Sequence, residues 1–179
     1  MAHIHTEPGQ HDVTSSALIV RLDTPSPQIL LHIHKKYGRL MQPGGHVELT
    51  ETPWQAVLHE ITEETGYNLE QLVVLQPKIR LKHLSNGVIH PVPACESTHI
   101  AIEKHFHTDR AYAFATYALP ADLPAKGEST DLFWYDAAAL VGLPDTEIGE
   151  DIRNICLFVL TVCAISWEQT PLTDFEADI

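Results

Sequence analysis

GHVELTETPWQAVLHEITEETGY, residues 45–67, combines a tight turn, a loop and a short helix. Thr52 can serve as the helix N-cap, and Pro53 suits the first helical position. Gln55 stands three residues after Thr52, as a capping box requires. Gly66 is the expected stop, because glycine readily adopts the left-handed conformation that ends a helix. The stretch therefore predicts a well-delimited helix between Thr52 and Gly66.

The predicted helix carries three glutamates on one face. Glu60, Glu63 and Glu64 are spaced i, i+3 and i+4, so their carboxylates lie together. No Lys or Arg occurs between Leu40 and Pro77 to neutralise them, and the last turn is the negative end of the helix dipole. An isolated triplet of this kind is usually a solvated face. Here the arrangement predicts a site for a divalent cation such as Mg²⁺, Mn²⁺ or Ca²⁺.

The same helix also has an apolar stripe, formed by Trp54, Val57, Leu58 and Ile61. Residues at this spacing predict that the helix packs onto a sheet. Trp54 is then expected in the core and not as a platform for a base. The acidic face is expected to be turned away from much of that packing.

The whole spaced set resembles the Nudix box. The family pattern is Gly, five residues, Glu, seven residues, Arg-Glu, an aliphatic residue, any residue, Glu-Glu, any residue, Gly and a bulky apolar residue. Here it runs from Gly45 through Glu51 to Tyr67, and His59 stands where the family has arginine. The resemblance implies an α+β fold, a mixed β-sheet between helices in an α/β/α sandwich.

The resemblance also implies an activity, which is hydrolysis of the pyrophosphate bond in a nucleoside diphosphate linked to another group. The implied cofactor is Mg²⁺ or Mn²⁺. Carried over residue by residue, Glu60, Glu63 and Glu64 are both catalytic residues and metal ligands, and the Gly44 carbonyl and Glu51 are further ligands. ADP-ribose, dinucleoside polyphosphates and modified nucleoside triphosphates all stay open as substrates.

The attacking water needs a proton acceptor, and different members of the family use different carboxylates. Glu60 and Glu64 are the first choices here. The alternative is a carboxylate from a distant loop, and the candidates are Glu103, Glu128 and Asp131.

The histidine in place of arginine is the one departure that bears on catalysis. His59 is shorter than arginine and is charged only at lower pH, although it could still donate to Glu51 or Glu63. It predicts either an enzyme with a pH-sensitive support for its carboxylates or a weak or inactive module that binds a nucleotide derivative. An isomerase of the same fold that uses a catalytic cysteine is disfavoured, because no cysteine precedes the box.

Other polar residues near the box are candidates for substrate contacts. His46 follows the double glycine, Arg39 stands upstream beside Lys35 and Lys36, and Glu128 belongs to a later loop. The cations could meet substrate phosphate. They could equally be exposed side chains on a hairpin turn.

Histidine is frequent in this chain, with 12 in 179 residues. His32 and His34 share one face of an expected strand, and His105 and His107 cluster with Asp109. These residues could line a substrate cleft, and either pair could contribute to a zinc site, although no cysteine accompanies them. The simpler interpretation is that they are scattered surface or hydrogen-bonded histidines.

The rest of the chain predicts a sheet around the helix. The expected strands are 14–22, 28–36, 72–81, 99–106, 111–119 and 132–135, with the first two forming a hairpin. A long helix is expected from Asp145, with a core-facing period of Ile148, Ile152, Ile155, Val159, Val162 and Ser166. Strands, then a helix, then further strands and a closing helix indicate a layered α+β fold.

Length and composition fit one globular domain. We expect it to span 12–170, between a flexible tail at 1–11 and an acidic tail at 171–179. The net charge of −13 argues against non-specific binding to nucleic acid or to an anionic membrane. The expected partner is a small-molecule nucleoside diphosphate derivative, and the resemblance adds a homodimer.

The three cysteines, Cys95, Cys156 and Cys163, show neither metal-ligand spacing nor a disulfide framework. Cys156 and Cys163 lie in an apolar helical run and are expected to be buried, reduced thiols. The first residues lack an apolar signal region, and no apolar run reaches about 18 residues. A cytoplasmic location is therefore expected.

Overall fold

The computed structural model describes residues 7–101 and 104–175. Its strands are β1 (His11–Arg21), β2 (Gln28–His34), β3 (Arg39–Met41), β4 (Gly44–His46), β5 (Leu72–Gln76), β6 (Cys95–Ile100), β7 (Phe106–Thr116), β8 (Leu132–Tyr135) and β9 (Glu168–Pro171). Its helices are α1 (Pro53–Thr65), α2 (Ala137–Gly142), α3 (Glu150–Phe158) and α4 (Ala164–Ser166), and a π-helical stretch, Val159–Cys163, joins the last two. No helix among the described residues is long and apolar enough to cross a membrane.

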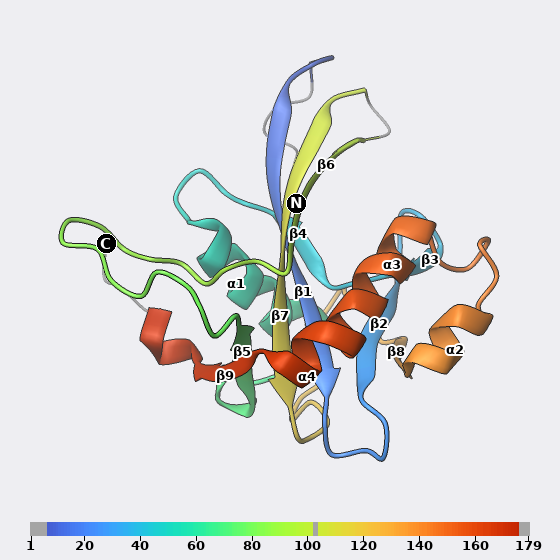
Figure 1. Cartoon of the computed structure of the whole chain (residues 1–179). Coiled ribbons are helices and arrows are strands. Elements are labelled where there is room, and N and C mark those ends of the chain that lie inside the picture. The colour runs from blue at the N-terminus through green and yellow to red at the C-terminus, as the bar shows by residue number, and fades with distance from the viewer. Residues whose placement is uncertain (1–6, 102–103, 176–179) are drawn as a thin grey trace.

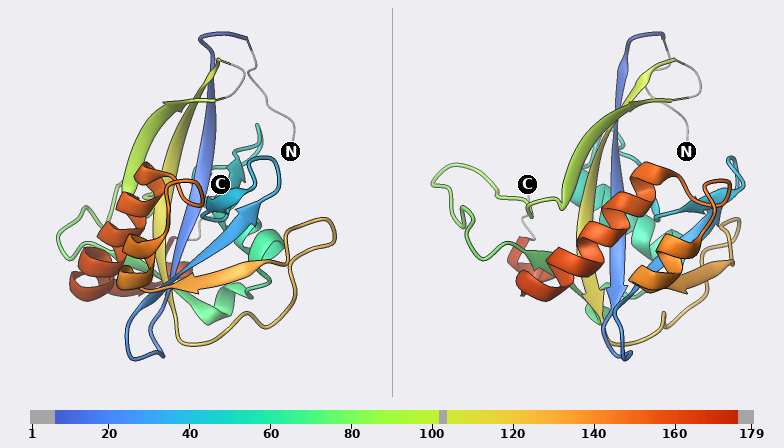
Figure 2. Two further views of the ribbon diagram at one scale, coloured as in Figure 1. Left: turned by 90° about the vertical axis from the view of Figure 1, so that its right-hand side faces the viewer. Right: turned by 45° about the vertical axis from the view of Figure 1, so that its right-hand side comes forward.

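These strands form one mixed sheet with helices on both faces (Figure 1). The main path runs β3-β2-β1-β7-β5-β9, with β4 paired to β1, β6 to β7 and β8 to β2. β1 and β7 are parallel along their whole length, from His11 opposite Phe106 to Arg21 opposite Thr116. Figure 2 shows α1 and α3 on opposite faces of the sheet, and β1, β6 and β7 extending beyond both. The expected mixed sheet between helices is confirmed.

Alternating side chains of β1 supply two separate cores, because successive residues of a strand point to opposite faces. Ala17 and Ile19 pack with Trp54 of α1 on one face. Leu18 and Val20 pack with the buried residues of the C-terminal helical segment on the other. Trp54 is thus a core residue, as expected, and α1 is held against the sheet by its apolar stripe.

Both ends of α1 match the expectation. The Thr52 hydroxyl accepts from the Gln55 backbone N–H at 3.3 Å, and the Gln55 side chain accepts from the Thr52 N–H at 2.8 Å. Gly66 ends the helix in the left-handed region, with φ 73°. A Cβ there would lie 2.2 Å from the Asp122 carbonyl oxygen, so this position needs glycine for space as well as for its backbone conformation.

The expected hairpin and the strand at 132–135 are confirmed, but three other strands differ. The strand expected at 111–119 is β7, which runs from Phe106 to Thr116. The expected strand 99–106 is wrong, because β6 ends at Ile100 and β7 begins at Phe106 on the other side of a turn. The strand expected over 72–81 stops at Gln76, where Pro77 has no N–H to continue the ladder.

The C-terminal helix begins later than predicted and exposes a different face. The Glu147 carbonyl accepts from the Leu40 N–H at 2.8 Å, and Ile148 forms a bridge with Leu40, so these residues extend the sheet before α3 starts. The π-helical stretch then rotates the following residues, since it adds a residue to the turn. Val162, expected in the core, is 39% exposed, whereas Cys163 is fully buried.

The segment after Thr170 also differs from the expected acidic tail. Pro171 belongs to β9, and residues 172–175 form a short 3₁₀ helix. Leu172 and Phe175 are buried in the core beside α1, and the ring of Phe175 lies 6.0 Å from that of Trp54. Residues 171–175 are therefore part of the packed domain.

The three thiols should differ sharply in reactivity. Cys156 and Cys163 are buried and free, as expected, and burial raises the pKa of each to about 12. At pH 8 both stay protonated, and a thiolate is the reacting species. We expect a disulfide reagent at pH 8 to modify only the half-buried Cys95 in the folded protein and all three thiols after unfolding in urea. Labelling of native Cys95→Ser would contradict this.

Candidate active site

The three carboxylates of α1 lie at graded depths. Glu60 is buried, with 5% of its surface exposed, whereas the side chains of Glu64 and Glu63 are 13% and 48% exposed. The expectation that the acidic face turns away from the packing therefore holds for Glu63 and is wrong for Glu60. Glu60 is one residue before Ile61 of the apolar stripe, and the loop at 118–130 covers the end of the helix.

Burial works against the charged forms of the two inner carboxylates. It raises the pKa of Glu60 to about 8, with further contributions from Glu64 and Glu63. Burial also raises the pKa of Glu64 to about 7, although the hydrogen bond from Gly44 acts in the opposite direction. Desolvation of this kind disfavours ionisation unless a positive charge lies close by.

These residues fit a divalent cation. The Oε1 atom of Glu60 is buried and has no hydrogen-bond partner among the described residues. A buried polar atom of this kind is costly, and a cation would supply both the missing partner and the missing charge. The donors are carboxylate oxygens, which hard ions such as Mg²⁺ and Mn²⁺ prefer. Glu60, Glu63 and Glu64 are the residues that would hold it.

The glycine turn reaches the helix directly. The Gly44 N–H donates to Glu64 Oε2 at 2.8 Å, so the expected ligand Gly44 lies beside an inner carboxylate. Its φ is +155°, and a Cβ would meet the Ser15 carbonyl oxygen at 2.5 Å. Only glycine allows β4 to approach β1 this closely, and that approach brings the turn to Glu64.

His59 lies at the outer edge of the site, and Glu51 belongs to the loop before the helix. His59 Nε2 is 3.2 Å from Glu63 Oε1, one helical turn away, and both side chains are about half exposed. The Glu51 carboxylate accepts from the Glu48 N–H at 2.9 Å and so closes the loop before the helix. Of the two partners considered for His59, the structure therefore places Glu63 in contact.

His32, one of the histidines that the sequence suggested for a substrate cleft or a zinc site, is a neighbour of the carboxylates. It is buried on β2, and its Nε2 lies 4.0 Å from Glu64 Oε2. Burial, followed by the nearby His34 and Lys35, lowers the pKa of His32 to about 4, so the ring is neutral at pH 7. Strand alternation offered a signal, because it puts His32 on the same face as Leu30, which packs in the core beneath α1.

A fourth carboxylate faces the helix from the loop at 118–130. The Ala125 N–H donates to the Glu63 carbonyl at 2.7 Å, which fixes the loop over the helix end. Glu128 follows; its charge contributes to the raised pKa of both Glu60 and Glu64. Lys35 Nζ lies 3.8 Å from Glu128 Oε2. Lys35 and Glu128 therefore border the site from opposite elements.

The other candidates lie elsewhere. Asp131 is exposed, and Glu103 lies outside the described residues. Arg39 is exposed and donates to the Asp145 carbonyl, at the edge of the sheet. His46 contacts His107 on β7.

A mixed sheet between helical layers, with a glutamate-bearing helix closed onto a glycine turn, is the architecture of one family of hydrolases. The NUDIX domain family matches residues 13–156. The chain belongs to this family and is a Nudix-type hydrolase. No curated protein matches it.

Solved structures agree with this assignment. A NUDIX-family hydrolase from Clostridium perfringens is 31% identical, with a TM-score of 0.69 over 83% of this chain and 95% of that one. The C. elegans Ap4A hydrolase has 20% identity and a TM-score of 0.54, covering 82% and 97%. The NUDIX domain of Shewanella oneidensis NrtR, solved with ADP ribose, has 15% identity and a TM-score of 0.58, covering 84% and 85%. The last two are similar in fold alone.

Proposed function

We propose that this protein hydrolyses the pyrophosphate bond of a nucleoside diphosphate linked to another group, and that it requires Mg²⁺ or Mn²⁺. The observation that carries the proposal is Glu60, whose buried carboxylate has an oxygen without a hydrogen-bond partner among the described residues. It lies beside Glu64, whose ionisation burial also disfavours. A fold that keeps two such groups together in a hydrolase favours a role in holding cations that neutralise phosphate.

The residues of the proposed site hold the metal ion, orient its ligands or accept a proton. Glu60, Glu63 and Glu64 hold the ion, with the Gly44 carbonyl and Glu51 as further ligands. When bound, a divalent ion neutralises the diphosphate and polarises the bond that breaks. The Gly44 N–H orients the Glu64 carboxylate through its 2.8 Å hydrogen bond. Glu60 is the first choice to accept the proton of the attacking water, and Glu128, which faces the same carboxylates, is the alternative.

The proposed substrate is a small nucleotide derivative. The net charge of −13 repels nucleic acid and free anions, so a diphosphate would bind with its metal ion. Lys35 is a cation at the border of the site, where it lies 3.8 Å from Glu128. The solved relatives named for Ap4A and for ADP ribose favour dinucleoside polyphosphates and ADP-ribose as the first compounds to test.

The test is a panel of substrates with either Mg²⁺ or Mn²⁺. ADP-ribose, diadenosine tetraphosphate and nucleoside triphosphates would be incubated with the protein, and the products identified by mass spectrometry. We expect cleavage between two phosphorus atoms that stops when EDTA is added. Inorganic pyrophosphate and a sugar monophosphate serve as controls, since neither is a nucleotide derivative. Metal-independent cleavage, or none on any nucleotide, would refute the proposal.

Replacing His59 by arginine should raise activity. Arginine is charged at every pH and has five donors, so it can hold Glu63 more firmly than the present 3.2 Å contact of an imidazole. Both side chains are about half exposed, and exposed pairs are worth less than about 1 kcal/mol. We therefore expect an increase in kcat of less than about fivefold for His59→Arg, measured at pH 8 as Mg²⁺-dependent phosphate release.

His59→Gln provides the matched control, because it places a polar side chain there without the positive charge of arginine. It should be no faster than the original protein. If His59→Arg turns a protein without measurable turnover into an active one, then the second hypothesis is correct, and the natural chain is a module that binds a nucleotide derivative. If arginine adds nothing to a fast enzyme, the substitution is neutral.

A further inference from the structure

We propose a second metal site, distinct from the acidic helix, that binds a zinc-like transition-metal ion. Its ligands are Asp12 on β1, His46 on β4, His105 before β7 and His107 on β7. We call these four residues the histidine site. It goes beyond the proposed hydrolysis, since none of the four contributes to the carboxylate cluster of α1.

The sheet brings these residues together from three distant parts of the chain. Asp12 is directly opposite His107 in the parallel pair of β1 and β7, and His46 is opposite Thr14 in the antiparallel pair of β1 and β4. Asp12 and His107 lie on the sheet face that carries Leu18 and the C-terminal helices, because alternate residues share a face. The α1 helix packs on the opposite face. The two sites are therefore on different sides of the sheet.

The ligand atoms lie close to one another, with Asp12, His105 and His107 as the tightest group and His46 beside it. His107 Nε2 lies 3.0 Å from His105 Nε2 and 3.4 Å from His46 Nε2. Asp12 Oδ2 lies 3.7 Å from His105 Nε2 and 3.8 Å from His46 Nε2. A tetrahedral ion with ligands about 2.0–2.1 Å away separates those ligands by about 3.4 Å. The four distances lie around that value.

His107 Nε2 lies within hydrogen-bond distance of two other ring nitrogens. A ring nitrogen either carries one hydrogen or offers one lone pair, so His107 Nε2 cannot make full hydrogen bonds to both of its neighbours. A metal ion accepts a lone pair from every nitrogen at once. The ligand atoms of Asp12, His105 and His107 lie within 4.8 Å of one another, and all three residues are buried. Burial keeps competing water away from them.

The donor set favours a borderline transition metal over magnesium. Three imidazoles and one carboxylate suit Zn²⁺, Co²⁺ or Ni²⁺, whereas Mg²⁺ prefers oxygen. Four protein ligands also complete a tetrahedral shell, which is typical of a structural zinc ion and leaves no position for substrate. The proposed role is therefore to fasten strands together.

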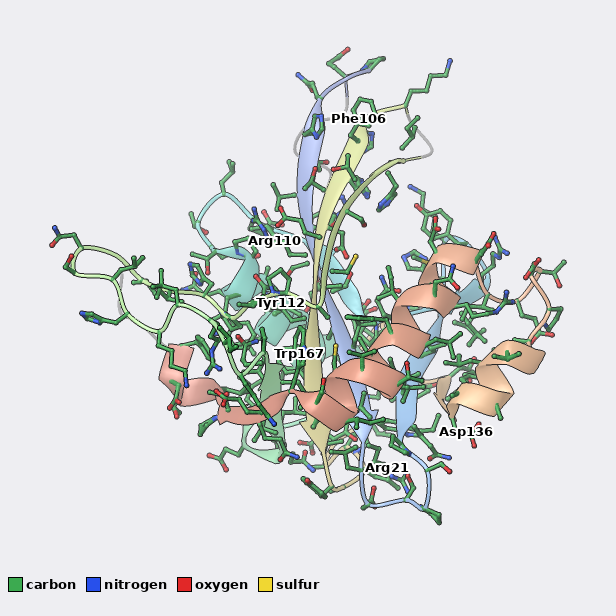
Figure 3. The ribbon with its side chains drawn as sticks, in the orientation of Figure 1. Arg21, Phe106, Arg110, Tyr112, Asp136 and Trp167 are labelled. Carbon is green, nitrogen blue, oxygen red and sulfur yellow. The ribbon has the colours of Figure 1, made fainter. Side chains whose placement is uncertain are left out.

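The position of the histidine site indicates which strands a bound ion would hold together. β1, β6 and β7 project beyond the helices (Figure 2), and Phe106, labelled in Figure 3, lies near the end of this projection. His105 and His107 flank Phe106 in the chain. His46 is two residues from Gly44, whose N–H orients Glu64. An ion here would hold the projecting strands together and fix β4, the strand that supplies the glycine turn.

Cobalt binding tests the proposal without reference to activity. The full-length protein, stripped with chelator, is titrated with Co²⁺ and then with Zn²⁺. We expect one equivalent of Co²⁺ to give the intense visible absorption of a tetrahedral ion, Zn²⁺ to displace it, and Zn²⁺ to raise the melting temperature. His46→Ala and His107→Asn should each weaken Co²⁺ binding more than about tenfold.

Two control variants distinguish the histidine site from the carboxylate cluster of α1 and from non-specific binding of Co²⁺ to surface histidines. His99→Ala removes an exposed histidine whose ring lies 5.4 Å from that of His107 but is not a proposed ligand, so its spectrum should match the original. Glu60→Gln should also keep the spectrum, even if hydrolysis fails. If circular dichroism shows that His107→Asn is unfolded, cobalt binding by His46→Ala tests the proposal instead, because His46 is partly exposed. Absence of a tetrahedral cobalt spectrum, or one unchanged in His46→Ala, overturns the histidine site.

Discussion

Replacing Glu60 by glutamine should lower kcat for nucleotide hydrolysis more than about 100-fold, since even residues that only support a metal ligand cost 10- to 100-fold when changed. Glutamine has nearly the same shape but carries no charge for a cation and cannot accept the proton of water. Glu60 is a buried residue of α1, so its replacement removes a carboxylate from the interior of the site. Steady-state rates at saturating Mg²⁺ and Mn²⁺ measure the effect.

Glu70→Gln is the matched control, because Glu70 is an exposed glutamate just beyond the end of α1. It removes the same charge from the protein and should leave kcat within about twofold, as surface changes usually do. Calorimetry with the substrate supplies a second readout. If Glu60→Gln keeps both its rate and its ligand affinity, the carboxylate cluster is not the active site. If the natural chain itself has no turnover and the variant keeps its ligand affinity, the protein is a binding module.

The second large effect is on stability in the absence of metal. The pKa of Glu60 is raised from its ordinary value of 4.5 to about 8. Between these values the folded protein holds a proton that the unfolded chain has released, so the free energy of unfolding falls as pH rises. His32, whose pKa is lowered to about 4, has the opposite effect, but only below its ordinary value of 6.5. We therefore expect EDTA-treated protein to lose about 2 kcal/mol between pH 6.5 and pH 8.

Urea unfolding at the two pH values measures this loss, and two comparisons assign it. Glu60→Gln should be more stable than the original at pH 8 and should show a smaller change, because of the two inner carboxylates only Glu64, whose pKa burial raises to about 7, is left to lose a proton. Saturating Mg²⁺ should restore stability at pH 8, since a ligand that binds only the folded state stabilises it. Equal pH dependence in the variant and the original would show that Glu60 is not the group that titrates.

Local chemistry in the sequence was sufficient to predict α1 and the strand at 132–135. The capping box at Thr52, the stop at Gly66 and the apolar stripe around Trp54 depend on residues within one or two helical turns of each other, and the structure has all of them. The family resemblance relied on the same short-range spacing. It predicted the mixed sheet between helices because family membership brings the fold with it.

Contacts between residues far apart in the chain set the start of the C-terminal helix and the burial of Glu60, which residue spacing alone does not predict. The helix expected at Asp145 starts later because the Leu40 N–H, more than 100 residues away, donates a hydrogen bond to the Glu147 carbonyl, which is then not available to the helix. The depth of Glu60 depends on the sheet and on the loop at 118–130, which no helical pattern reveals.

The sequence by itself determined the box, its carboxylates and the helix that presents them, because those contacts are local. Only the tertiary structure placed His32 against Glu64 and gathered Asp12, His46 and His107. The parallel register of β1 and β7 sets Asp12 opposite a residue 95 positions later, and such a register depends on the packing of the whole sheet.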